Sequence, residues 1–305
     1  MDINNFDEFF HDKISPFLGE IEEKREKIAT SLYIIIAVLI VIDLISFAGT
    51  GFSMFTGIFI FIISIVVYAT VYNIITRKYL SSFSSDILNK LIKFIDESLS
   101  YSRSDHITKQ EYAQSKLYST YYDGFSGSDL VYGKMGKTSI KFSHLYVYEE
   151  TEDEDSDGHK TTSRTTIFNG IMFIADFNKN FNGEVFVLPR RFKLFKSSKS
   201  VTLEDPDFHK YFDVYGSDQI MSRYVLSTSL VKRILDYREN IGKDIRMSLI
   251  DSTLYVGIPG YDGLKIPVFS TILDKNLYKN YLYRFHVGPQ IVNELNLNTR
   301  IWTKN

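Results

Sequence analysis

Cysteine is absent from the 305-residue chain, which excludes disulfides, thiolate nucleophiles and cysteine-ligated metal sites. The six histidines are scattered, and no pair has a metal-binding spacing such as H-x-x-x-H. We therefore expect neither a bound metal ion nor a cofactor, and the sequence assigns no catalytic residue. The formal net charge is only −2, so the chain lacks the basic field that accompanies nucleic-acid binding.

Two long apolar runs stand near the start, at residues 31–47 and 52–75. A helix rises about 1.5 Å per residue, so about 20 apolar residues cross a bilayer. The second run is long enough, and the first is too when Ala29 and Ala48 are included. Buried core helices seldom stay apolar on all sides for so long. The sequence thus predicts a transmembrane helical hairpin over residues 29–76.

Positive charges flank this hairpin on one side. Lys24, Arg25 and Lys27 precede the first run, and Arg77 and Lys78 follow the second. Because positive flanks stay in the cytoplasm, we expect both termini there, with only the short link between the runs on the far side.

Asp43 is the one charged residue inside the two runs. An acid in a membrane span suggests a function, but this one lies near the outer end of its helix, where it can reach the interface. Its role stays open.

Amphipathic segments lie on both sides of the hairpin. Residues 1–28 form one, with phenylalanine and isoleucine at helical spacing, and a similar stripe opens residues 77–118. Their mixed polar faces favour a helical stalk over a position on the lipid surface. Within the second segment, Thr108 and Glu111 have the spacing of a helix capping box.

Residues 119–305 predict a cytoplasmic α+β domain. Alternating apolar and polar residues indicate strands, and these cluster without regular strand–helix–strand alternation, so the sheet should be mainly antiparallel. The expected elements are strands at 138–150, 164–177 and 183–189, a helix over 228–241 stopped by Gly242, a hairpin turning at Asp251 and Ser252, and helices near 274–283 and 289–297.

An acidic stretch, residues 149–158, contains a D-x-D-x-D-G spacing that begins at Asp153, as in a calcium loop. Such a loop needs glutamate at its twelfth position, which is Arg164 here, and it needs helical flanks. Because both requirements fail, we interpret the stretch as a solvated hairpin tip.

A basic segment near the middle of the domain is a candidate contact surface for anionic lipid or a partner. Each basic residue close to such a membrane is worth on the order of 1 kcal/mol. A solvated loop is the alternative. The candidate residues are Arg190, Arg191, Phe192, Lys193, Lys196 and Lys199.

Three blocks of the domain resemble a known family. Residues 166–189 contain F-x-G followed by A-D-F-N, residues 203–235 contain E-D-P-x-F, and residues 245–259 form the third block. The chain resembles the bacterial membrane family called domain of unknown function 3137, over nearly its whole length. The resemblance implies an integral protein of the bacterial inner membrane with a cytoplasmic domain, and it supplies no catalytic residues.

Two functions remain. The favoured one is a membrane-tethered, non-enzymatic binding or scaffold module for a protein partner or an inner-leaflet lipid, with 118–125 and 204–212 as further candidate contact segments. The alternative is an enzyme for a membrane-associated substrate, which would need two carboxylates with separated pKa values. Its candidates are Asp176, Glu204, Asp205, Asp207 and Asp218. The oligomeric state is left open.

Overall fold

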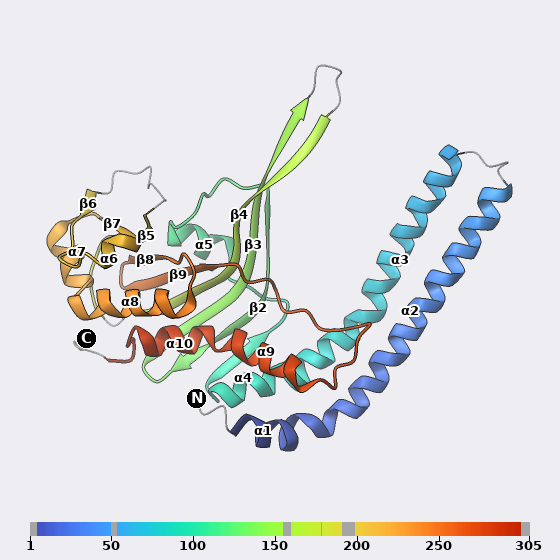
Figure 1. Ribbon diagram of the computed structural model, residues 1–305, viewed down its shortest axis with the longest axis horizontal. Coiled ribbons are helices and arrows are strands. Elements are labelled where there is room, and N and C mark those ends of the chain that lie inside the picture. Colours follow the sequence, from blue (N-terminus) through green and yellow to red (C-terminus); the bar gives the residue numbers. More distant parts are fainter. Residues whose placement is uncertain (1–4, 50–53, 155–159, 178, 191–198, 300–305) are drawn as a thin grey trace. The chain divides into compact units, whose positions relative to one another are not determined.

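The computed structural model describes residues 5–49, 54–154, 160–177, 179–190 and 199–299. The chain divides into two compact units (Figure 1). We call them the helical unit, Met1–Phe94 with Lys265–Tyr281, and the sheet unit, Ile95–Leu264 with Leu282–Asn305.

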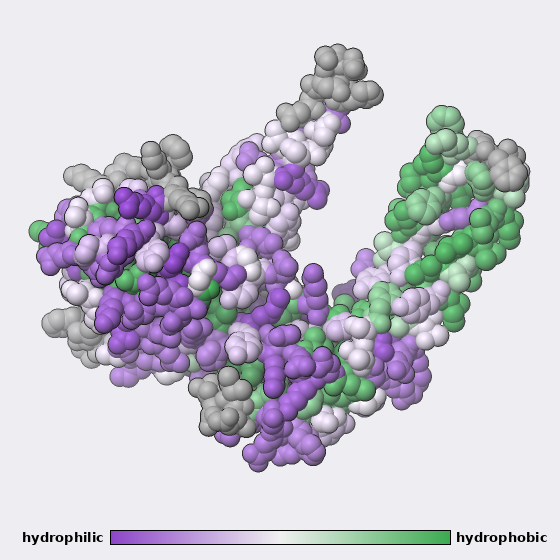
Figure 2. Space-filling view, in the orientation of Figure 1, coloured by the Kyte–Doolittle hydropathy of each residue, from purple (hydrophilic) through white to green (hydrophobic). Residues whose placement is uncertain are grey.

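The helical unit is built on two long helices. The first runs without a break from Phe6 to Gly49 and the second from Met54 to Ile95, and both are long and apolar enough to cross a membrane. Hydrophobic side chains cover much of their outer surface (Figure 2). In the most apolar window, 11% of the first helix and none of the second is buried, so the described chain does not use them as core helices. Their segments are α1 Phe6–Phe9, the π-helical turn η2 Phe10–Ile14, α2 Ser15–Gly49, α3 Met54–Phe83, the π-helical turn η3 Ser84–Leu88 and α4 Asn89–Ile95.

The amphipathic ends of these helices pack against each other. The rings of Phe9 and Phe94 stack at 4.1 Å between centroids, and Phe6 meets Phe94 edge-on at 6.3 Å. The Lys90 ammonium lies 3.0 Å from the centroid of the Phe17 ring. The aromatic stripes of the two helices therefore face one another.

Helix α4 ends earlier than a helical stalk over 77–118 would require. After Ile95 the chain turns into strand β1, Leu99–Ser102, which pairs with β2 and belongs to the sheet. A four-residue strand carries too little alternation to be recognised in the sequence.

The sheet unit contains, in the described residues, one antiparallel nine-stranded sheet in the order β1-β2-β3-β4-β9-β8-β5-β7-β6. This confirms the α+β class. The pairing of β4 with β9 joins the first four strands to the other five. Beyond β1, the strands are β2 Gly124–Met135, β3 Thr138–Glu154, β4 Lys160–Asp176, β5 Glu184–Pro189, β6 Lys199–Val201, β7 Phe212–Gly216, β8 Arg246–Ile250 and β9 Thr253–Pro259.

Helices cover both faces of this sheet. Helix α5, Lys109–Ser115, packs on one face against Leu145, Phe168 and other apolar residues. On the opposite face α10, Val287–Glu294, lies so close that a Cβ on Gly288 would be 2.2 Å from the Phe142 ring. The remaining helices are α6 Phe208–Tyr211, α7 Gln219–Val225, α8 Thr228–Ile241 and α9 Lys275–Phe285.

The aromatic segment 118–125 contributes to the core beneath α5. The Tyr118 ring lies 4.5 Å from that of Phe168, and Tyr122 and Phe125 pack together at 5.4 Å. Tyr121 alone among these tyrosines is largely exposed, at 70%. Three of the four aromatic rings of the segment therefore pack inward, whereas Ser119, Thr120, Tyr121 and Asp123 are exposed, so its role as a contact surface stays a prediction.

Two turns follow the sequence-based prediction. Asp251 and Ser252, at φ of 44° and 66°, form the left-handed turn between β8 and β9. Gly242 caps α8 at a φ of 62°, a conformation that glycine adopts without steric cost.

The predicted capping box is present at the start of α5. The Thr108 hydroxyl accepts a hydrogen bond from the Glu111 amide, and the Glu111 carboxylate accepts one from the Thr108 amide. We expect Thr108→Ala to lower the opening free energy of α5 by about 1 kcal/mol, because one amide at the helix start loses its acceptor. Hydrogen exchange of the α5 amides measures this. Gln110→Ala, at an exposed position of the same helix, serves as control, and equal exchange in the two variants would contradict the assignment.

Candidate functional site

A cavity of about 480 Å³ opens beside the start of α8, and we call it the α8 groove. Its size is that of a small-ligand or peptide site. Buried apolar side chains form its floor, namely those of Leu203, Leu226 and Val231. Polar side chains form its rim, namely those of Glu204, Asp205, Arg223, Ser227 and Thr228.

Local hydrogen bonds fix the walls of this groove. Lys179 donates to the carbonyls of Tyr224 and Val225, at 2.6 and 3.2 Å, and so caps the C-terminal end of α7. Burial lowers the pKa of Lys179, but the two carbonyl oxygens give its ammonium a polar environment. Arg223 donates to the Thr202 carbonyl at 3.2 Å, which ties α7 to the opposite wall.

Three of the carboxylates considered for catalysis have local structural partners. Asp205 accepts hydrogen bonds from two amides just before and within α6, at 2.9 and 3.1 Å. Asp218 caps α7 by accepting from the Met221 amide at 2.7 Å. Asp207 pairs with Lys210 at 2.6 Å. These roles follow from the usual preference of aspartate for helix starts.

Within the described part of the chain, two of the five carboxylates lie together at the α8 groove. Glu204 and Asp205 line the α8 groove, whereas Asp218 lies at the start of α7 and Asp176 at the end of β4. Glu204 is exposed.

The basic segment is described only at its first residue and in the backbone of its last. Arg190 is exposed; its amide donates to the Tyr211 carbonyl at 3.0 Å, and its guanidinium donates to the His209 carbonyl at 3.4 Å. Contact with lipid or a partner stays a prediction, because the other candidate side chains lie outside the described residues: Arg191, Phe192, Lys193, Lys196 and Lys199.

The acidic stretch forms part of the β3–β4 hairpin, with Glu154 paired to Lys160. Residues 155–159 lie outside the described residues, as does the side chain of Asp153. Among the residues that the structure describes, no group of three or more histidine or acidic side chains is arranged to hold a metal ion.

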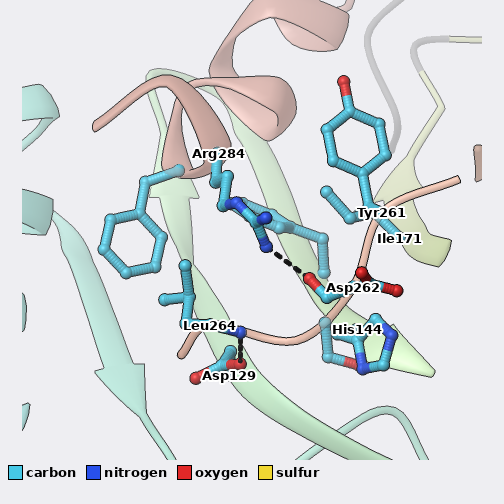
Figure 3. Close-up of a pocket in the computed structure, with 10 residues that line it drawn as sticks. Asp129, His144, Ile171, Tyr261, Asp262, Leu264 and Arg284 are labelled. Carbon is cyan, nitrogen blue, oxygen red and sulfur yellow. Dashed lines mark hydrogen bonds between the residues drawn. The ribbon is translucent and has the colours of Figure 1, made fainter. Parts of the chain in front are cut away.

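A polar cluster surrounds Asp129, which lies at a bulge of β2 with a φ of 63° (Figure 3). Its carboxylate is buried and accepts hydrogen bonds from the Tyr101 hydroxyl at 2.7 Å, the Ser128 hydroxyl at 2.6 Å and the Leu264 amide at 3.0 Å. Burial and the adjacent Asp129 charge both raise the pKa of Tyr101, so its hydroxyl stays protonated and donates.

A second chain of contacts extends this cluster. A ring nitrogen of His144 is 2.9 Å from the Asn169 side-chain oxygen, and the Asn169 amide donates to the Asp262 carboxylate at 3.3 Å. Arg284 donates to the Asp262 carbonyl (Figure 3). The cavity among these residues is only about 30 Å³, which is room for water but not for a substrate. The cluster thus holds the 262–264 loop in place.

The helical unit contains a buried ion pair that the sequence did not reveal. Arg25 and Glu22 interact at 2.9 Å, with side chains only 8% and 10% exposed. Arg25 also donates to the Val268 carbonyl at 2.9 Å, and Glu22 accepts from the Ile272 amide at 3.0 Å. We call this arrangement the Glu22–Arg25 clamp. Arg25 is therefore not the solvated flanking charge that its place before the first apolar run suggested.

The clamp holds the return segment, residues 265–281, on the two long helices. On the second helix, the Tyr79 hydroxyl donates to the Pro267 carbonyl at 2.7 Å. The return segment thereby has hydrogen-bond partners on both α2 and α3.

The clamp should weaken in acid. Burial alone would raise the pKa of Glu22, but hydrogen bonds from Arg25 and the Ile272 amide outweigh it, so this pKa lies below its ordinary value of 4.5. A lowered folded-state pKa contributes stability above the ordinary pKa, and this contribution is lost as pH falls through the folded-state value. Hydrogen exchange at the Ile272 amide, corrected for intrinsic rates, should lose protection only below about pH 4.5. In Glu22→Gln that pH dependence should vanish; its persistence would refute the assignment.

Asp43 has one partner inside the helix pair. The Ser64 hydroxyl donates to its carboxylate at 2.7 Å, which links α2 to α3. This contact gives the acid a structural role between the two helices.

Comparison with known proteins identifies a family for the C-terminal part of the chain. Residues 166–297 match the model described as "Protein of unknown function (DUF3137)". This part of the chain is similar to the DUF3137 family. The predicted resemblance is confirmed over these residues, although the match does not reach the two long helices. The bacterial origin that the family suggests stays a prediction.

Further comparisons give little else. No curated protein matches it. One solved structure, the crystal structure of the mycobacterial trehalose monomycolate transport factor A, TtfA, aligns with 10% sequence identity and a TM-score of 0.37. That alignment covers 70% of this chain and 96% of the mycobacterial one. So weak a likeness does not establish a shared fold or function.

Proposed function

We propose that this protein is a membrane-tethered binding module. The hairpin over residues 29–76 spans the bacterial inner membrane with both termini in the cytoplasm, and the sheet unit binds a segment of a protein partner in the α8 groove. One observation carries the proposal: a cavity of peptide size occurs in a chain whose two long apolar helices are largely exposed within the described residues.

The chemistry of the groove supports a protein ligand. Its buried apolar floor suits one or two apolar side chains, and the rim offers charges of both signs, Glu204 and Arg223, for the flanking polar groups. Next to the groove, α7 exposes Ile220 at 81% and Tyr224 at 43%. These two residues are one helical turn apart, so they share a face and extend the apolar surface. Anionic lipid fits a mixed-charge rim less well.

The alternative function, an enzyme, has weaker support. Of the two carboxylates at the groove, Asp205 already accepts hydrogen bonds from two backbone amides. An acid and a base with separated pKa values would need a second carboxylate in a different environment, and the groove's other acid, Glu204, is exposed.

In-cell photo-cross-linking tests the proposal. A photo-reactive phenylalanine analogue replaces Thr228 at the rim of the groove or, as the matched control, Glu239 on the exposed face near the far end of the same helix. We expect one protein to be captured in high yield from position 228 and not from position 239. Capture of lipid alone, or the same products from both positions, would overturn the proposal.

A substitution that fills the α8 groove with a large side chain provides a complementary test of partner binding. Thr228→Trp should abolish capture by a photo-reactive group at position 204, because the indole occupies the mouth of the cavity. Glu239→Trp should leave that capture unchanged.

A further inference from the structure

The return segment exposes two large apolar side chains although it is well packed. Phe269 is 45% exposed and Leu273 is 54% exposed, whereas their neighbours Val268 and Ile272 are 5% and 0% exposed. The buried neighbours are those beside the Glu22–Arg25 clamp, which fixes the backbone at both positions. The exposed pair is therefore held outward by an ordered backbone.

Phe269 lies at a defined level of the long helices. Its ring centroid is 5.4 Å from that of Tyr33 on α2 and 6.3 Å from that of Tyr72 on α3. Tyr33 stands near the beginning of the first apolar run and Tyr72 near the end of the second, so both mark the same end of the hairpin. Tyr68, one turn further into the second run, extends the group at 6.3 Å from Tyr72.

This arrangement has the composition of a membrane interface. Tyrosine is enriched where a span meets the headgroups, because its ring is apolar and its hydroxyl is polar. Immediately outside the aromatic group come cations: Lys27 before the first run, Arg77 and Lys78 after the second. Phe269 thus continues an aromatic belt formed by the ends of both spans, although it belongs to a segment far away in sequence.

We infer that the return segment is a membrane-contacting loop, with Phe269 inserted among the lipid headgroups of the cytoplasmic leaflet. The inference rests on the proposed hairpin topology and goes beyond it, because it assigns a lipid contact to a part of the chain outside both spans. Lipid is the occupant that the observations favour, since the exposed Phe269 ring lies beside Tyr33 and Tyr72, at the end of the exposed apolar runs. The clamp then determines how deeply the loop lies.

Depth-dependent fluorescence quenching tests this contact. The natural tryptophan, Trp302, is replaced with phenylalanine, and one new tryptophan is introduced by Phe269→Trp in the full chain. The variant is reconstituted in phosphatidylcholine–phosphatidylglycerol vesicles whose acyl chains carry bromine either close to the headgroup or close to the chain end. We expect a clear loss of emission with the shallow bromines and a smaller loss with the deep ones.

Two further single-tryptophan variants serve as the positive and the negative control. Ile62→Trp, in the middle of the second apolar run, should be quenched most by deep bromines, and Ile220→Trp, on α7 of the sheet unit, should not be quenched. If the tryptophan at position 62 is quenched and the one at position 269 is not, the inferred lipid contact of the return segment is wrong, whereas the second apolar run still spans the membrane. If neither is quenched, the proposed membrane topology itself fails, and the inference fails with it. Hydrogen exchange at the Ile272 amide verifies that Phe269→Trp leaves the clamp closed.

Discussion

Replacing Arg25 with alanine is expected to release the return segment from the long helices. The substitution leaves the Glu22 carboxylate buried without its cation, and the Val268 carbonyl loses its donor. Removing one partner of a buried ion pair typically costs about 3 to 5 kcal/mol. The loss should be local, since the helices themselves keep their backbone hydrogen bonds.

Hydrogen exchange across the return segment measures the effect in detergent or nanodiscs. Lys27→Ala is the matched control, because Lys27 pairs with Glu23 on the same helix in full solvent, where such a pair contributes little to stability. We expect fast exchange at Ile272 in Arg25→Ala and native exchange in Lys27→Ala. Native protection in both variants would show that the clamp does not hold the segment.

Gly170→Ala is expected to destabilise the sheet strongly. A Cβ at this position would lie 2.1 Å from the Ile258 carbonyl oxygen and 2.9 Å from the Pro259 Cα, which are backbone atoms of the paired strand β9. Rotamer changes cannot relieve a clash with backbone, so β4 and β9 must separate locally. Overpacking of this kind costs about 3 kcal/mol, at the upper end of the usual range.

The same substitution at a second glycine, Gly19, is expected to have the opposite effect on stability. Gly19 lies in α2 with no atom within 4 Å of its added Cβ, and alanine there should stabilise the helix by about 0.8 to 1 kcal/mol. Thermal unfolding of the two variants, followed by β-sheet circular dichroism, should show a clear drop for Gly170→Ala and none for Gly19→Ala. A native melting temperature for Gly170→Ala would contradict the close approach of β4 and β9.

Local signals predicted much of the fold. The capping box at Thr108, the turn at Asp251 and the stop at Gly242 each depend on residues within one helical turn of each other, so one sequence suffices to find them. The long strand β3 alternates clearly for the same reason, and β4 is marked instead by a continuous apolar run at residues 171–175, all of them buried. Strand β2 is not recognisable in this way, because glycines interrupt its alternation and a bulge at Ser128 shifts its register.

The candidate sites could be predicted less well, because their members meet only in the folded chain. Asp129 contacts Leu264 across 135 positions, and Arg25 contacts Val268 across 243. A single sequence contains no pattern at such separations. The carboxylates considered for catalysis stand out by residue type alone. The structure makes Asp218 the N-cap of α7 and gives Asp205 two amide donors in the turn that leads into α6.

Site-directed cysteine labelling tests the membrane-tethered arrangement most directly, since the cysteine-free chain gives no background. Ala48→Cys places a thiol near the link between the apolar runs, and Glu239→Cys places one on the sheet unit. With both termini in the cytoplasm, a membrane-impermeant maleimide added to spheroplasts is expected to label position 48 at once and position 239 only after lysis. Labelling of position 239 in intact spheroplasts, or protection of position 48 until lysis, would contradict this arrangement.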